Sequence, residues 1–125
     1  MYTLAVRRNF IARHALVGGD WGPENQPHSH HYVLELQLAG AELDRYGYLV
    51  DILDVEKHLD ELVARYSEHF LNDFPEFAKL NPSLENFARI TCGQLSDGIR
   101  AANIKTVRVQ LWENEAAWAS YEIKR

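Results

Sequence analysis

Three histidines are spaced so that their side chains can meet at one point. His28 and His30 are two residues apart, so in an extended segment they leave the same face and can reach one ion together. His14 has the matching alternation in the preceding segment and supplies a third nitrogen if the two segments pair as a hairpin. Three neutral imidazoles with an open fourth position are typical of a catalytic zinc site. The alternative is three loop histidines with no common partner, because H-x-H pairs are common.

The elements that must position these histidines are two strands joined by a long loop. Residues 2–16 alternate between two faces and predict a first strand, and residues 30–38 alternate strictly and predict a second, antiparallel to the first. The stretch between them, 17–27, holds three Gly, two Pro, Asp and Asn, which predicts a loop.

The rest of the chain predicts two helices and then two more strands. Apolar residues recur at three- and four-residue spacing from Val55 to Phe70, with Asp54 as a plausible N-cap, and a second helix begins near 81–83. Strands follow at 107–111 and 118–123, joined by a turn. We therefore expect one α+β domain over residues 1–125, an antiparallel four-stranded sheet in ββααββ order with two helices on one face. Its open edges favour assembly with other copies.

Composition excludes several classes of protein. The net charge of -5 and the lack of a Lys/Arg cluster argue against a nucleic-acid partner. No apolar run approaches the roughly 18 residues of a membrane-spanning helix. The single cysteine, Cys92, cannot form an intrachain disulfide, and the first residues lack the layout of a signal peptide, so we expect a cytoplasmic location and no membrane partner.

Short segments, each a weak signal alone, follow one another along nearly the whole chain: Phe10-Ile11-Ala12-Arg13-His14-Ala15-Leu16, His28-Ser29-His30-His31-Tyr32, Gly47-Tyr48-Leu49-Val50-Asp51, Leu71-Asn72, Asn81-Pro82-Ser83-Leu84-Glu85-Asn86, and Trp112-Glu113-Asn114 with Tyr121. In that order they resemble the F-x-A-x-H-x-L, H-G-H-N-Y, G-M-V-x-D, L-N, N-P-T-x-E-N and E-T motifs and the tyrosine of the 6-pyruvoyltetrahydropterin synthase and 6-carboxytetrahydropterin synthase family. The shared order strengthens the metal-site interpretation.

The resemblance implies a T-fold (tunnelling fold), whose subunits join their sheets into an oligomeric barrel, usually a homohexamer made of two trimers. It also implies Zn2+ held by His14, His28 and His30. The family's substrate is the small-molecule pterin 7,8-dihydroneopterin triphosphate, and the reaction is that of a carbon-oxygen lyase that expels triphosphate.

The resemblance also names residues for the pterin. Glu113 matches the family's anchor, and one carboxylate can accept hydrogen bonds from an N–H and an amino group side by side. Without the resemblance Glu113 would be read as a solvated turn glutamate. Ser83 and Glu85 match family positions near the pterin, although the start of a helix explains both equally well. Asp51 is as compatible with a structural role as with a functional one.

The chain departs from the family at the groups that move protons. The family's cysteine, four residues before the first His of H-x-H, is Glu24 here, which is either a substitute general base or a loop glutamate facing water. The family's Asp-His pair falls on Ser67 and Glu68, and His69 lies one residue late. His69 replaces the missing histidine only if the helix end is distorted, because one residue turns a side chain by about 100°.

Three hypotheses for function follow. The first is a zinc-dependent pterin lyase acting on dihydroneopterin triphosphate or a related dihydropterin, including a form that yields 6-hydroxymethyldihydropterin, in queuosine-type, folate or biopterin synthesis. The second is a pterin- or purine-binding homologue without lyase activity. The third is a structural trimer or hexamer whose histidines bind nothing.

Overall fold

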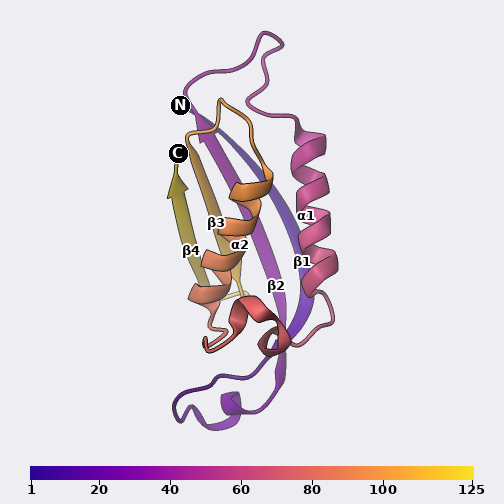
Figure 1. Cartoon of the computed structure of the whole chain (residues 1–125), viewed down its shortest axis with the longest axis vertical. Helices are drawn as coiled ribbons and strands as arrows, with labels where there is room; N and C mark the ends of the chain where they lie inside the picture. Colours follow the sequence, from indigo (N-terminus) through magenta and orange to yellow (C-terminus); the bar gives the residue numbers. More distant parts are fainter.

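A four-stranded antiparallel sheet with two helices on one of its faces forms the protein, as the computed structural model of residues 1–125 shows (Figure 1). The elements are β1 (Tyr2–His14), β2 (His28–Gly40), α1 (Ile52–Tyr66), α2 (Leu84–Gly98), β3 (Thr106–Trp112) and β4 (Trp118–Lys124), with short 3-10 turns at Gly22–Asn25, Leu71–Asp73 and Pro75–Phe77. The sheet order is β1-β2-β3-β4. The predicted α+β arrangement in ββααββ order is confirmed.

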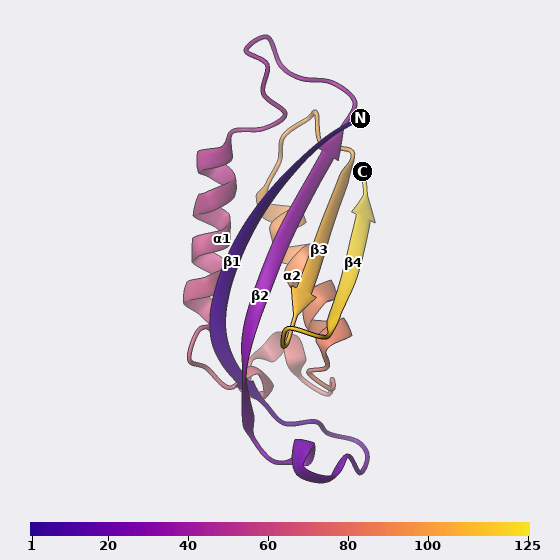
Figure 2. The same cartoon turned by 180° about the vertical axis from the view of Figure 1, so that it is seen from behind.

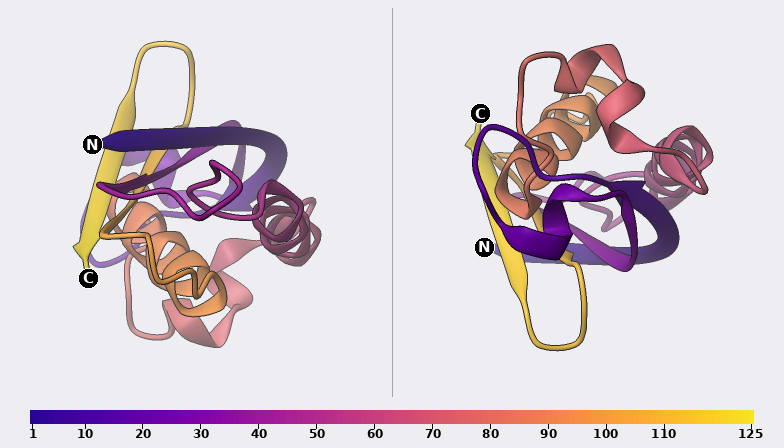
Figure 3. Two further views of the ribbon diagram at one scale, coloured as in Figure 1. Left: turned by 90° about the horizontal axis from the view of Figure 1, so that it is seen from above. Right: turned by 90° about the horizontal axis from the view of Figure 1, so that it is seen from below.

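The two long strands β1 and β2 alternate between a buried and an exposed face because their sequences do. Tyr32, Leu34, Leu36 and Leu38 of β2 all lie beneath the helices with at most 1% exposure. The opposite face carries no helix (Figure 2). The loop that joins β1 to β2 projects at the end of the molecule away from both termini, and Figure 3 looks onto it from below.

The first helix begins earlier than its sequence pattern predicts. Asp51, not Asp54, is the N-cap: its side chain accepts a hydrogen bond from the Leu53 amide at 3.0 Å. Asp54 lies in the first turn, where its charge favours the helix dipole. The helix ends at Tyr66, and Glu68 then adopts a left-handed φ of 63° that turns the chain towards β1.

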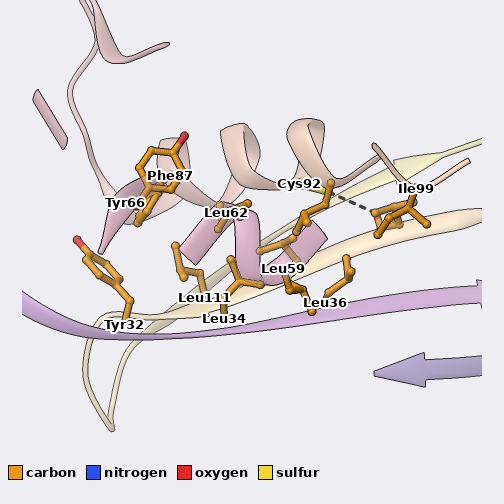
Figure 4. Packing of buried hydrophobic residues seen from close by; sticks show 14 of the residues in the cluster. Tyr32, Leu34, Leu36, Leu59, Leu62, Tyr66, Phe87, Cys92, Ile99 and Leu111 are labelled. Atoms are coloured by element: carbon orange, nitrogen blue, oxygen red, sulfur yellow. Dashed lines mark hydrogen bonds between the residues drawn. The ribbon is translucent and has the colours of Figure 1, made fainter. Parts of the chain in front are cut away.

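Aromatic side chains fill the core between the helices and the end of the β1–β2 hairpin. Phe87 of α2 makes edge contacts with Tyr32 and Tyr66 at ring-centroid distances of 5.1 and 5.2 Å (Figure 4). It makes edge contacts with Phe10 and Phe77 as well. Each such pair adds about 0.5–1.5 kcal/mol beyond area burial. Phe87 therefore ties α2 to the strands.

Cys92 lies in the core, whereas Trp112 and Trp118 lie on the surface of the sheet. Cys92 is fully buried, and burial raises the pKa of its thiol to about 11. Trp112 and Trp118 pair on the helix-free face of the sheet, and Trp118 is 51% exposed, so neither belongs to the core. No helix has the length and apolar character needed to cross a bilayer.

Replacing Phe87 with alanine should lower the free energy of unfolding by about 3–5 kcal/mol, because a fully buried ring is lost from a packed cluster. Urea unfolding followed by circular dichroism measures the change. The matched control is Leu53→Ala at a side chain that is 73% exposed, for which we expect about 0.5 kcal/mol or less. Equal losses in the two variants would contradict the assignment of Phe87 to the centre of the core.

Candidate metal centre

The end of the β1–β2 hairpin brings His14, His28 and His30 together. His14, the last residue of β1, pairs directly with His28, the first residue of β2, and Ala12 pairs with His30. One nitrogen from each ring lies within 4.8 Å of those of the other two. The two segments therefore pair as the hairpin on which the third nitrogen depends, and the three side chains form one cluster, called the histidine cluster below.

Two backbone carbonyls fix which nitrogen of His14 and His28 carries the proton. The Nδ1 of His14 lies 2.8 Å from the Pro82 carbonyl, and the Nδ1 of His28 lies 2.8 Å from the Gln26 carbonyl. A carbonyl oxygen can only accept, so each Nδ1 is the donor and each neutral ring leaves a lone pair on Nε2. These two Nε2 atoms are 2.9 Å apart. Two lone pairs facing each other at this distance are satisfied by a cation, either a metal ion or one added proton.

The third ring has a buried nitrogen without any hydrogen-bond partner. It is the Nε2 of His30, and the nearest acidic atom, Oε2 of Glu113, is 3.8 Å away. Buried polar atoms are rarely left unpaired, because losing hydration without a replacement costs about 1–3 kcal/mol. A metal ion in the histidine cluster would satisfy this nitrogen together with the two lone pairs, so the residues present fit such an ion.

Burial keeps the most enclosed member of the cluster neutral. His14 is only 2% exposed, and desolvation lowers its pKa to about 4, with the neighbouring His28 and His30 acting in the same direction. The Pro82 carbonyl and the Glu24 carboxylate act in the opposite direction. His14 is therefore neutral at pH 7, the form that binds a metal.

Glu113 faces an open cavity beside the cluster. It follows the last residue of β3, its amide donates to the Ala117 carbonyl at 3.2 Å, and its side chain is 26% exposed. The cavity measures about 570 Å³ and is lined by His30, Glu113, Trp112 and Arg7, among others. The Arg7 guanidinium lies 5.0 Å from the centre of the Trp112 ring. A flat molecule anchored on Glu113 would therefore lie next to the histidines.

A second cavity, of about 640 Å³, lies between the first residues of β1 and segment 44–53. It is at the other end of β1 from the histidine cluster, and of the residues considered above only Asp51, the N-cap of α1, lines it. Its lining is mostly apolar, so it offers no chemistry comparable to that of the cavity beside Glu113.

Of the other candidate substrate residues, Ser83 has a clear structural role. Its hydroxyl accepts from the Asn86 amide at 3.2 Å and caps α2, and its neighbour Pro82 holds His14. Glu85 is exposed in the first turn of α2. Contact of either residue with a pterin stays a prediction.

The two candidate proton-transfer residues lie in different surroundings. Glu24 is exposed in the turn Gly22–Asn25, and its charge acts to raise the pKa of His14, so its carboxylate lies within electrostatic range of the histidine cluster. His69 is exposed beside β1, where its carbonyl accepts from the Arg13 amide at 2.9 Å. Its ring turns back to the Ser67 carbonyl, 2.8 Å from Nδ1, and does not join the cluster.

Sequence reasoning missed the backbone groups that orient the histidines of the cluster. The carbonyls of Pro82 and Gln26 carry no sequence signal, because every residue has a carbonyl. Asn72 belongs to a quoted motif, but its pairing with the backbone of Ala15 depends on two segments 57 residues apart. Only the folded chain reveals such contacts.

The sheet, its two helices and the hairpin together define a T-fold protein. The 6-pyruvoyl tetrahydropterin synthase of Caenorhabditis elegans superposes with a TM-score of 0.85 at 20% identity, covering 98% of this chain and 96% of the other. The Plasmodium vivax 6-pyruvoyl tetrahydropterin synthase superposes with a TM-score of 0.81 at 17% identity, covering 99% and 98%. At these identities the likeness shows the fold.

Sequence comparison then gives the family. The model of the 6-pyruvoyl tetrahydropterin synthase family matches residues 3–124, and the chain belongs to this family of lyase-type pterin synthases. A protein of Archaeoglobus fulgidus named as a 6-carboxy-5,6,7,8-tetrahydropterin synthase is 27% identical over 122 residues, covering 98% of this chain and 95% of the relative. The dihydroneopterin monophosphate aldolase of Pyrococcus furiosus is 31% identical over 110 residues, covering 86% and 85%. The expected resemblance is confirmed.

Removing one ring of the cluster should abolish stoichiometric metal binding. We expect His30→Ala and His14→Ala to lose most of the zinc that the wild type carries, about one ion per subunit, because two imidazoles are a weak site. Elemental analysis of protein purified without chelator or affinity tag provides the measurement. His31→Ala is the matched control, since His31 leaves the opposite face of β2 and bonds Asn9. Full zinc content in both ligand variants would refute the site.

Proposed function

We propose that the protein is a zinc-dependent enzyme that cleaves the side chain of a phosphorylated 7,8-dihydroneopterin to give 6-hydroxymethyl-7,8-dihydropterin. The observation that carries the proposal is the exposed Glu24 beside a three-histidine cluster, in the place where the family pattern has cysteine. Two relatives support it: the Pyrococcus furiosus protein is named an aldolase, and a Plasmodium vivax structure is described as an alanine mutant of a catalytic glutamate.

Binding in this proposal begins at Glu113. Its carboxylate accepts two parallel hydrogen bonds from the pterin ring, while the ring occupies the cavity beside Trp112. The side chain of the substrate then points towards the histidine cluster, because His30 lines the same cavity. Zinc held by His14, His28 and His30 would make the hydroxyls of that side chain more acidic.

The chemical step is a retro-aldol cleavage that Glu24 starts as general base. Glu24 takes the proton of the 2′-hydroxyl, and the C1′–C2′ bond breaks as the C2′ carbonyl forms. The released electron pair passes to the pterin ring system, and a proton returns to C1′. The products are 6-hydroxymethyl-7,8-dihydropterin and a phosphorylated glycolaldehyde, so the step balances without an oxidant or reductant.

The remaining predicted properties belong to the same proposal. His69 lies outside the cluster, with its Nδ1 bonded to the Ser67 carbonyl, so a catalytic role for it would need a site that another subunit brings to it. We propose a homohexamer of two trimers, because β4 and the part of β1 before Ile11 each have an outer edge that no other strand of this chain pairs with. We also propose a cytoplasmic location.

Expulsion of triphosphate, the carbon-oxygen lyase reaction, is the second candidate. The name of the Archaeoglobus fulgidus relative favours it. A pterin-binding protein without turnover is the third, because Ser67 and Glu68 occupy the positions of the family's Asp-His pair. Product analysis distinguishes all three.

The variant Glu24→Gln should lower turnover of dihydroneopterin phosphates by about a hundredfold or more, because the amide cannot accept the proton. Zinc content and pterin affinity should stay at wild-type values. Chromatography with fluorescence detection of the pterin product measures turnover, and Glu122→Gln, an exposed residue of β4, is the control. Unchanged turnover in Glu24→Gln would remove Glu24 from the mechanism.

Glu113→Gln should weaken neopterin binding by about 1.5–3 kcal/mol, since the charge and one acceptor of a paired hydrogen bond are lost. Isothermal titration with neopterin provides the value, and Glu122→Gln again serves as the control. Equal affinities for wild type and Glu113→Gln would show that the pterin is anchored elsewhere.

A further inference from the structure

Asn25 folds the loop between β1 and β2 back on itself. Its Nδ2 donates to the carbonyls of Leu16 at 3.0 Å and Gly19 at 2.9 Å, and its Oδ1 accepts from the Trp21 amide at 2.7 Å. Both hydrogens of the amide group are used, so no other side chain of this size could replace it. Three points of the loop are therefore attached to one half-buried residue.

Glu24 is attached to the same point of the loop. The Leu16 amide donates to the Glu24 carbonyl at 2.9 Å, while the Leu16 carbonyl accepts from Asn25. Leu16 comes two residues after His14. The main chain of Glu24 is thus held to Leu16, just beyond the end of β1. One of the two hydrogen bonds is made by Glu24 itself and the other by its neighbour Asn25.

Leu16 is itself fixed by the helical side of the molecule. Asn72 pairs with both backbone groups of Ala15, accepting from its amide at 3.0 Å and donating to its carbonyl at 2.9 Å. Asn81 accepts from the Val17 amide at 3.0 Å. Residues 15–17 therefore form a fixed segment between His14 and the loop that carries Glu24.

We propose that Asn25 is a positioning residue for Glu24, holding that carboxylate beside the histidine cluster. The inference rests on the proposed role of Glu24 as general base. Asn25 touches neither the cluster nor the cavity of Glu113 and acts through its neighbour. Without this attachment the loop would sample other conformations, and alignment of a catalytic group within about 1 Å governs much of its effect.

Kinetics on the zinc-loaded protein test the proposal. Asn25→Ala should lower kcat for dihydroneopterin monophosphate by about tenfold to a hundredfold, with KM and zinc content unchanged. Asn25→Asp, which keeps the shape and the acceptor but loses both donors, should lose kcat as well. In the background of Glu24→Gln, Asn25→Ala should have no further effect, because a residue that acts only through Glu24 has nothing left to position.

The control is a matched loop contact at the other end of the molecule. The Oδ1 of Asp44 accepts from the Tyr46 amide at 2.8 Å and the Tyr48 amide at 3.0 Å, so Asp44→Ala releases a loop without touching the site. Its kcat should equal that of the wild type. Two outcomes would overturn the proposal. One is a kcat of the double variant Glu24→Gln/Asn25→Ala that is lower than that of Glu24→Gln by the full factor that Asn25→Ala causes alone, and the other is a wild-type kcat in Asn25→Ala.

A second measurement does not depend on turnover. Hydrogen exchange at the Leu16 amide reports its bond to Glu24, and Asn25→Ala should speed that exchange by about tenfold or more while amides in the centre of β2 keep their protection. Unchanged exchange at Leu16 would overturn the positioning role. Absence of any turnover in the wild type would instead refute the proposed function, and the exchange result would still decide whether Asn25 fixes Glu24.

Discussion

The antiparallel pairing of β1 with β2 is the constraint on which the rest of the site depends. The register runs from Tyr2 opposite Gly40 to His14 opposite His28 without a bulge. Because side chains alternate along a strand, this register places His14, His28 and His30 on the buried face together. A shift of β1 or β2 by one residue would turn the histidines of that strand to the other face. The histidine cluster is therefore specified by the strand pairing, which the leucines and aromatic residues further along the same face stabilise.

Other elements approach this hairpin end from two directions. From the helical side, the start of α2 presents the Pro82 carbonyl to His14, and the aromatic cluster around Phe87 keeps that helix in place. From the sheet, β3 pairs with β2 so that Trp112 lies opposite Val33, and the next residue, Glu113, reaches His30. The histidine cluster and the cavity beside Glu113 thus share one supporting strand, β2.

Much of this could be predicted from the sequence, because it depends on local periodicity. Alternation gave the strands and the shared face of His28 and His30, and the spacing of apolar residues gave both helices. The N-cap of α1 was misplaced at Asp54 because both Asp51 and Asp54 are good capping residues and only the backbone conformation distinguishes them. The tautomers of His14 and His28 could not be foreseen, since they depend on carbonyls.

The loop contacts of Asn25 and Asn72 were likewise beyond prediction, because they join segments by hydrogen bonds that leave no periodic pattern. The position of His69 depends on Glu68, whose backbone adopts the left-handed conformation, and a glutamate in the sequence does not predict that conformation. The folded structure was therefore needed most for the two candidate proton-transfer residues, Glu24 and His69.

In the proposed site, the imidazoles of His14, His28 and His30 hold zinc and leave one coordination position open to the substrate. X-ray absorption at the zinc edge of the purified protein tests it most directly. We expect the zinc to have about four nitrogen or oxygen neighbours at about 2.0–2.1 Å, three of them imidazole nitrogens, and the remaining oxygen to change when dihydroneopterin is added. A zinc coordination shell that contains sulfur, has fewer than three imidazoles or stays unchanged when the pterin is added would contradict this assignment.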